Sequence, residues 1–294
     1  MKNFVFEEIE VGEELGPHEY FLAAPFVQKY CAAIDSTCPW QIREASSLIR
    51  IVPPTLLGNL SFRLLETKFY RQAGTVHAGQ EFEFFYPIPW ESKLLSRGKI
   101  LDKYIKRAKQ WVVYEAHFYD EKGRALGRSR LTEVLPGYGE EPSEGGRGTA
   151  GGERPGASSF SHSPALEPVL RKVTQEKMTA YSEEGQTAKR GISIHIHEEV
   201  ARRAGFKGTL AQGLMSADYI SELMVRAFGS GWIQGGKLSL KFIAPVYAGD
   251  TITAQGVVKG QTPEREGQRV LVETWCENQT GQRVAVGTAS ALLV

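Results

Sequence analysis

The chain has 294 residues, of which 41% are hydrophobic and 23% charged, a globular composition with room for one large or two modest domains. Its 35 basic and 34 acidic residues leave a net charge of +1, so no overall field favours nucleic acid or an anionic membrane. Three cysteines without metal or disulfide spacing, an acidic start unlike a signal peptide and no apolar run of about 18 residues predict a cytoplasmic protein with reduced thiols, no metal and no membrane segment.

The first 136 residues begin with helices and continue as strands. Apolar periodicity predicts a helix over residues 25–34, and a second helix over 54–65 follows a proline-rich turn. Apolar side chains then alternate with polar ones, as in a strand with one buried face, at Val112, Tyr114, Ala116 and Phe118. Gly123 marks a hairpin turn into the next strand.

Residues 137–165 differ in composition from both flanking regions. They are rich in Gly, Ser, Pro and Glu and contain almost no aliphatic side chains, so they cannot bury enough apolar surface to order themselves. We interpret this stretch as a flexible linker between two domains of similar length, residues 1–136 and 166–294.

The second half repeats the order of the first. Thr174 is a suitable N-cap for a helix over residues 175–181, and an apolar helix over 213–225 follows a glycine-rich turn. A strand comes next, with Leu238, Leu240 and Phe242 on one face. Gly281 marks a hairpin turn like that at Gly123.

An internal repeat relates the halves without a gap. An offset of 158 residues places Pro53-Pro54-Thr55 on Ala211-Gln212-Gly213, Phe84 on Phe242, Pro87 on Pro245 and Gly123 on Gly281. One register that holds over about seventy residues indicates a duplicated unit. Each unit is predicted to be α+β, with one central helix wrapped by an antiparallel sheet.

The segment around residues 195–215 has the residue types of a catalytic site. Histidine is the commonest proton carrier near neutral pH, and the backbone amides at a helix start, here near Gly213, attract an anion or a carbonyl oxygen. Together they would polarise a carbonyl and move a proton beside it. The same residues also fit a plain loop and helix start with a surface histidine, and residue chemistry alone leaves both interpretations open.

The same stretch also carries a family resemblance. Residues 194–208 read Ile-His-Ile-His-Glu-Glu-Val-Ala-Arg-Arg-Ala-Gly-Phe-Lys-Gly, and residues 210–215 read Leu-Ala-Gln-Gly-Leu-Met. This resembles the hydratase motif of the MaoC-like family, which runs Asp-x-Asn-Pro-x-His, an acidic helix start, Gly-Phe and Ala-His-Gly-Met. The resemblance implies two tandem hotdog domains packed as a double-hotdog pseudo-dimer.

The resemblance also implies an activity, that of a hydro-lyase in fatty acid metabolism. Such enzymes hydrate a 2-enoyl-CoA reversibly or dehydrate a 3-hydroxyacyl thioester, without a cofactor, and take CoA or an acyl-carrier protein as the substrate's handle. His195 matches the catalytic histidine, and Gly213 matches the glycine whose N–H contacts the thioester carbonyl. Ala211, Gln212, Leu214 and Met215 are the implied substrate-binding residues, and the neighbouring His197 is expected to be exposed.

The family's catalytic aspartate has no counterpart here. Five residues before His195 stands Arg190, and an alignment with a short insertion places Gln186 there instead. We therefore take Gln186 and Glu184 as candidate catalytic residues, because Glu184, or its neighbour Glu183, could supply the carboxylate if the following loop folds back.

The first half resembles the motif only in part. Residues 35–41 read Asp-Ser-Thr-Cys-Pro-Trp-Gln, with Gln41 in place of the histidine, and Pro54 has no N–H to offer an oxyanion. This half is predicted to be catalytically silent and, by the resemblance, to accommodate the acyl chain. Asp35 is then expected to be structural.

Alternatives to the hydratase remain. The chain could be a hotdog acyl-CoA thioesterase, which would need a carboxylate or water-positioning group at the helix start, where Gln212 stands. It could also be a non-catalytic acyl-thioester-binding or partner subunit, and a homodimer of double hotdogs is a further arrangement that the resemblance allows. The basic cluster at residues 103–109 is expected to be a solvated hairpin turn, with a contact to CoA phosphates as the alternative.

Overall fold

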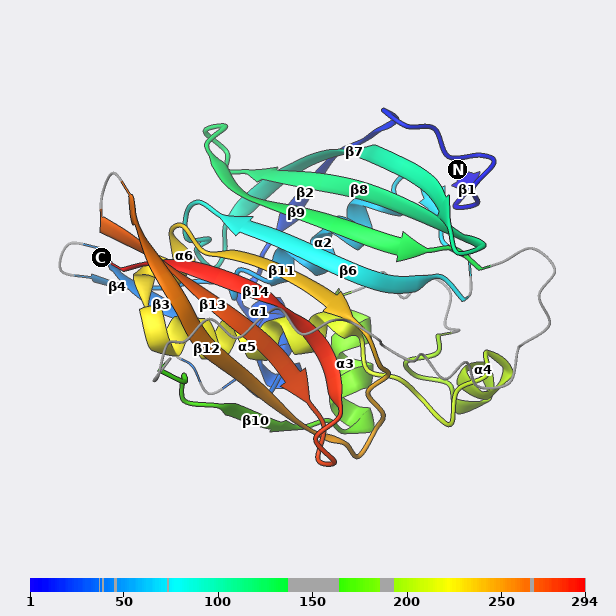
Figure 1. Cartoon of the computed structure of the whole chain (residues 1–294). Helices are drawn as coiled ribbons and strands as arrows, with labels where there is room; N and C mark the ends of the chain where they lie inside the picture. Colours follow the sequence, from blue (N-terminus) through cyan, green and yellow to red (C-terminus); the bar gives the residue numbers. More distant parts are fainter. Residues whose placement is uncertain are drawn as a thin grey trace.

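A single ten-stranded antiparallel sheet forms the frame of the molecule (Figure 1). The structure is a computed structural model, and it describes residues 1–36, 38, 40–44, 47–72, 74–136, 164–185, 193–264 and 267–293. Five strands from each half enter the sheet. The two sets meet at its centre, where β6 (Val76–Phe84) pairs with β11 (Lys237–Phe242).

Both halves use the same strand order. From one edge to the centre, the first half runs β2 (Glu14–Phe21), β7 (Lys93–Lys106), β8 (Lys109–Tyr119), β9 (Ala125–Val134) and β6. The second half runs β10 (Val169–Lys172), β12 (Thr251–Glu264), β13 (Gly267–Glu277), β14 (Arg283–Leu293) and β11. This symmetry is the predicted duplication, and the α+β double-hotdog fold class is confirmed.

The repeat of 158 residues holds strand by strand. β12 begins at residue 251 and β7 at 93, a difference of 158, and the starts of β13 and β8 (267 and 109) and of β14 and β9 (283 and 125) differ by the same number. The two hairpin glycines are also equivalent, with φ of 78° at Gly123 and 77° at Gly281. Both turns thus require the left-handed conformation that glycine adopts without steric cost.

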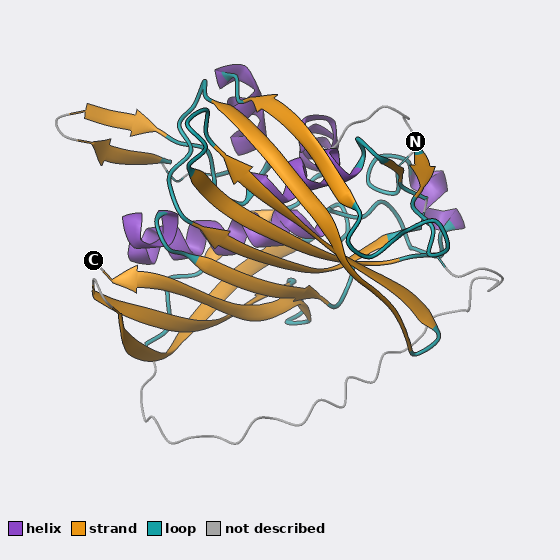
Figure 2. Ribbon diagram, turned by 90° about the horizontal axis from the view of Figure 1, so that it is seen from above, coloured by secondary structure: helices purple, strands orange, loops and turns teal. Residues whose placement is uncertain are grey.

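The two central helices lie on one side of the sheet and fill the core (Figure 2). α2 (Leu56–Leu65) and α5 (Gly213–Phe228) are buried along most of their length, α5 including the acidic side chains of Asp218 and Glu222. α1 (Ala24–Ala33) packs against α3 (Gln175–Gly185), and Thr174 caps α3 as expected by accepting a hydrogen bond from Lys177 N at 3.3 Å.

Short elements complete the fold. α4 (Glu198–Arg203) and α6 (Ser230–Ile233) are helices of six and four residues. β1 (Lys2–Asn3) runs parallel to β5 (Phe69–Tyr70), and β3 (Gln41–Glu44) pairs antiparallel with β4 (Ser47–Arg50). The predicted linker lies outside the described residues up to residue 163, and at its end Ala165 forms a β-bridge with Val257. The domain boundaries therefore stay a prediction.

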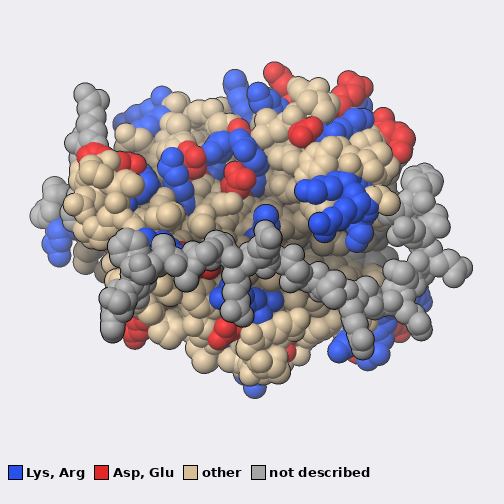
Figure 3. Space-filling model, in the orientation of Figure 1, with Lys and Arg blue, Asp and Glu red and all other residues tan. Residues whose placement is uncertain are grey.

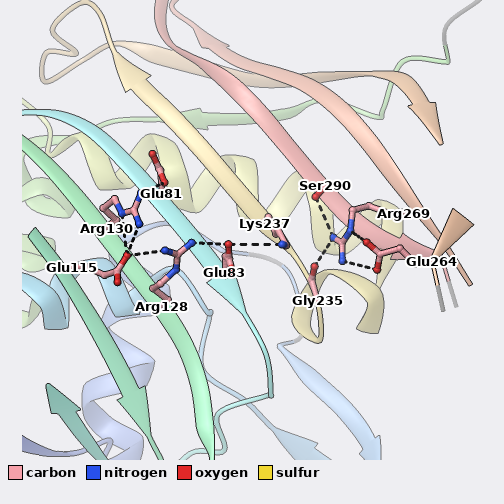
Figure 4. Close-up of polar contacts among 10 residues, drawn as sticks. All are labelled: Glu81, Glu83, Glu115, Arg128, Arg130, Gly235, Lys237, Glu264, Arg269 and Ser290. Atoms are coloured by element: carbon pink, nitrogen blue, oxygen red, sulfur yellow. Dashed lines mark hydrogen bonds and ion pairs between the residues drawn. The ribbon is translucent and has the colours of Figure 1, made fainter. Parts of the chain in front are cut away.

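The outer face of the sheet carries mixed charges rather than a field of one sign (Figure 3). A row of ion pairs crosses the seam between the halves (Figure 4). Arg128 bridges Glu115 at 2.8 Å and Glu83 at 2.6 Å, and Lys237 of the second half lies 3.8 Å from Glu83. Glu115 is buried and Arg128 and Glu83 are partly buried, so these pairs add to the strand pairing and the core that join the two halves.

The basic cluster at residues 103–109 is a hairpin turn, but it is only partly solvated. The chain reverses at Arg107 and Ala108, which both have positive φ. Lys103, however, donates hydrogen bonds from Nζ to the carbonyl oxygens of Phe6 and Ile9, at 2.8 and 2.7 Å. This side chain therefore holds the N-terminal segment against the sheet, because its ammonium group donates to two carbonyl oxygens of that segment.

Candidate functional site

A cavity of about 260 Å³ lies between the two halves and contains most of the predicted site. The second half supplies His195 and the start of α5, and the first half supplies Phe62, Arg71 and His77. The cavity walls are mostly apolar, with a few polar groups that converge on the same space. That combination is typical of a small-molecule site.

His195 is held by its neighbours in a fixed orientation. Its ring Nδ1 lies 2.7 Å from the carbonyl oxygen of Leu210, and its own carbonyl accepts a hydrogen bond from Gln175 Nε2 at 3.0 Å. A carbonyl oxygen can only accept, so Nδ1 carries the proton that forms this bond. In the neutral ring the other nitrogen, Nε2, then holds the lone pair that a general base needs.

Burial keeps this imidazole neutral. The low-polarity surroundings lower the pKa of His195 to about 4, against the opposing effect of the Leu210 carbonyl, and the positive charge of Arg71 lowers it further. The ring is therefore unprotonated near neutral pH and ready to take a proton. Among the described residues, no carboxylate forms a hydrogen bond or ion pair with it.

Gly213 is the first residue of α5, where backbone N–H groups have no partner within the helix. No hydrogen bond to another described residue occupies its N–H. The helix dipole adds partial positive charge at this end, so the amide can stabilise negative charge on an oxygen. The residue has to be small because a Cβ here would lie 3.0 Å from the ring of Phe242.

The other predicted binding residues separate into two groups. Ala211, Gln212 and Leu214 line the cavity with Gly213, whereas Met215 does not and packs in the hydrophobic core. The reason is the helical period, because a residue two positions after Gly213 points to a different face of α5. The amide of Gln212 is partly engaged, since its Nε2 donates to Ser182 Oγ and, at 3.4 Å, to the Met178 carbonyl.

The candidates for the missing carboxylate cannot be placed. Gln186 and Arg190 lie outside the described residues, and Glu183 and Glu184 belong to α3 but their side chains are outside the described part. His197 is exposed as expected and directly precedes α4, with its Nδ1 accepting a hydrogen bond from Ser193 N at 3.3 Å.

The motif-like residues of the first half, Asp35 and Gln41, have structural positions away from the cavity. Asp35 has a φ of 53° and forms an ion pair with Lys177 of α3 at 3.0 Å, which agrees with its predicted structural role. Gln41 begins the β3–β4 hairpin and does not line the cavity. Arg71 and His77, in contrast, were not predicted, because no motif contains them and only the cavity reveals their position.

The described part of the chain contains no cluster of three or more potential metal ligands. It also contains no helix of the length and apolarity that crossing a membrane requires. The polar groups at the cavity include the His195 imidazole, the helix-start amide of Gly213 and the pair of Arg71 and His77 from the first half.

Comparisons of the sequence point to one family. The family model described as MaoC like domain matches residues 167–283. An (R)-specific enoyl-CoA hydratase of Rhodospirillum rubrum is 38% identical over 100 residues, which are 34% of this chain and 67% of that protein. A peroxisomal multifunctional enzyme type 2 of Drosophila melanogaster is 25% identical over 224 residues, which are 74% of this chain but only 35% of that longer protein.

Solved structures share the whole architecture. A MaoC-like dehydratase superposes with a TM-score of 0.74 at 14% identity, over 97% of this chain and 98% of that one. A Mycobacterium tuberculosis protein described as having a double hotdog fold gives a TM-score of 0.68 at 11% identity, over 99% and 98% of the two chains. At these identities the likeness establishes the fold alone.

Proposed function

The chain belongs to the MaoC-like family of hydratases and dehydratases, and we propose that it hydrates a 2-enoyl-CoA reversibly, with His195 as the base and the Gly213 N–H as the donor to the thioester oxygen. The observation that carries the proposal is the presence of both groups in one cavity. The name of the Rhodospirillum rubrum relative gives the reaction, and the cavity chemistry is compatible with it.

The reaction needs these two groups at opposite ends of a conjugated system. As water adds to Cβ, its oxygen forms the new C–O bond and one of its protons passes to Nε2 of His195. The electron pair of the double bond moves toward the thioester carbonyl, whose oxygen becomes an enolate and is stabilised by the Gly213 N–H. Return of the proton to Cα completes the hydration. One preorganised donor of this kind contributes roughly 3 kcal/mol.

The weak point of the site is the strength of the base. A pKa of about 4 for His195 suits an imidazole with no anionic partner, and proton transfer works best when the pKa of the base lies near the working pH. A carboxylate brought close to the ring would stabilise the imidazolium and raise that pKa. The side chains of Glu183 and Glu184, which precede His195 in the chain, are the candidates for that carboxylate.

The test is incubation with crotonyl-CoA while the absorbance of the enoyl thioester and the release of free thiol are followed together. Hydration depletes the enoyl absorbance and releases no thiol, and this is the expected result. Thiol release would identify a thioesterase instead, although Nε2 of the Gln212 amide that such an enzyme could use already donates to Ser182 and Met178. Binding of acyl-CoA with neither change would make the chain an acyl-thioester-binding protein.

A further inference from the structure

The first half presents a polar cluster to the cavity that the proposed hydration does not use. Arg71 and His77 both line the cavity. Glu133, which is fully buried and does not line it, forms an ion pair with Arg71. His77 is the second residue of β6 and lies directly opposite Glu133 of β9, and the register slips by one residue between His77 and Gly79. A β-bulge of this kind re-aims a side chain and is over-represented beside active sites.

The cluster has unused hydrogen-bonding capacity. His77 Nε2 and Arg71 Nε are buried, and each lacks a hydrogen-bond partner among the described residues. The only hydrogen bond that Arg71 makes to a described residue is from Nη2 to Glu133, although a guanidinium has five N–H groups. The side chain of Arg71 is still 19% exposed whereas that of Glu133 is 0% exposed, so Arg71 is the member of the pair that a ligand can reach.

Aromatic rings fix the positions of both side chains. The guanidinium carbon of Arg71 lies 4.5 Å from the centroid of the Phe62 ring, and the ring of His77 lies between Phe62 and Phe242, at 5.2 and 4.8 Å. Phe242 is also the ring that covers Gly213. The polar cluster is therefore one aromatic ring away from the amide proposed to hold the thioester oxygen.

The fold itself does not require these groups. At the offset of 158, Arg71, His77 and Glu133 correspond to Gly229, Gly235 and Ala291. The second half has a small residue at each of these positions, in the connections after α5 and α6 at Gly229 and Gly235 and within β14 at Ala291. A buried ion pair is seldom a net gain over apolar packing, so its presence in one half alone indicates a role other than folding.

We propose that Arg71 and His77 bind an oxygen-bearing substituent on the acyl group, so that the favoured substrate is an enoyl thioester with a carboxylate or hydroxyl beyond Cβ. Arginine is donor-only, which requires acceptor oxygens on the ligand. His77 is neutral, because burial and the charge of Arg71 lower its pKa to about 3, and a neutral imidazole can bond a hydroxyl as well as a carboxylate. This inference rests on the proposed acyl-thioester substrate.

Binding of saturated analogues tests the inference without any chemistry. Calorimetry would compare butanoyl-CoA with 4-hydroxybutanoyl-CoA and with the mono-CoA thioester of butanedioic acid. We expect at least one oxygenated analogue to bind the parent protein about tenfold more tightly than butanoyl-CoA, since hydrogen bonds to charged or buried groups give discrimination of that size. Equal dissociation constants for all three in the parent protein would overturn the proposal.

Two variants locate the preference. His77→Phe keeps a ring between Phe62 and Phe242, and Arg71→Gln combined with Glu133→Gln removes both charges so that neither remains buried alone. Loss of the preference for the hydroxyl analogue in His77→Phe would assign the hydroxyl to His77. Loss of the preference for the carboxylate analogue in the double variant would assign the carboxylate to Arg71. The exposed Lys99→Gln is the matched control and should keep the parent preference. A preference that survives both cavity variants would contradict the assignment.

The same samples separate this inference from the proposed function. The parent protein would also be assayed for hydration of the three corresponding 2-enoyl thioesters. A binding preference without hydration would refute the hydratase and keep the acyl-group site. Hydration at equal efficiency for all three substrates would keep the hydratase and refute the acyl-group site.

Discussion

The Nδ1 atom of His195 lies 2.7 Å from the carbonyl oxygen of Leu210, and this bond determines which ring nitrogen is free to act as a base. Because burial lowers the pKa of the ring to about 4, the base stays unprotonated down to acidic pH. We expect kcat/KM for crotonyl-CoA to be flat from pH 8 to about pH 5 and to fall below it. An acid limb near pH 6 would mean that a carboxylate reaches the ring and stabilises its charged form.

Replacement of the base tests the assignment directly. His195→Ala should lower turnover roughly 10²-fold or more, since that is the usual contribution of a general base. The melting temperature should change little, because the side chain is only half-buried and lies at the cavity rather than in the core. His197→Ala, which alters the exposed neighbour, is the control and should keep full activity. Equal activity in both variants would remove His195 from the mechanism.

The contact between Gly213 and Phe242 gives a second test. A methyl group at residue 213 would lie 3.0 Å from the Phe242 ring, closer than ordinary packing allows, so Gly213→Ala should displace the ring by a few tenths of an ångström and lower kcat. The helix should remain intact, since Gly213 is not among the residues with positive φ. Adding Phe242→Leu should restore part of the activity if crowding is the cause. A double variant no better than Gly213→Ala would exclude this explanation.

Much of the fold could be predicted from the sequence, because the 158-residue repeat and the apolar periodicity of the helices are both visible in local sequence patterns. The offset that aligned Gly123 with Gly281 also aligned three pairs of strand starts, and the apolar periodicity placed α2 and α5. Met215 was misplaced because a motif gives residues in sequence order, whereas the helix turns successive residues to different faces. Arg71 and His77 could not be predicted as cavity residues, because their position in the same cavity as His195 depends on how the two halves pack together, and no local sequence pattern contains that information.

A buried ion pair anchors the edge strand of the second half to α5. Arg171 of β10 donates from Nη2 to Glu222 at 2.6 Å, and the side chain of Glu222 is only 1% exposed. Glu222→Ala would leave the Arg171 charge buried without this partner, so the free energy of unfolding should fall by about 3–5 kcal/mol. The exposed helical pair of Glu199 and Arg203 is the comparison, and Glu199→Ala should cost less than about 1 kcal/mol. Urea unfolding of both variants measures the difference.

Asp218 of α5 should make the stability depend on pH. It accepts hydrogen bonds from Tyr30 at 2.7 Å and Tyr181 at 2.8 Å, and burial raises its pKa to about 7 despite these bonds. The pKa of an unfolded Asp is about 3.9, so between pH 4 and 7 the native state holds a proton that the unfolded state has lost. Stability from this group is therefore fully present below pH 4 and is lost as pH rises through about 7. Relative to the parent protein, the free energy of unfolding of Asp218→Asn should rise by up to about 1.4 kcal/mol per pH unit in that window. Above pH 7 the difference between the two proteins should stay constant. Urea unfolding from pH 5 to 8 measures the difference, and Asp102→Asn, at an exposed position, is the control. If the free energies of unfolding of the parent protein and Asp218→Asn differ by the same amount over this whole range, Asp218 is ionised in the folded protein throughout.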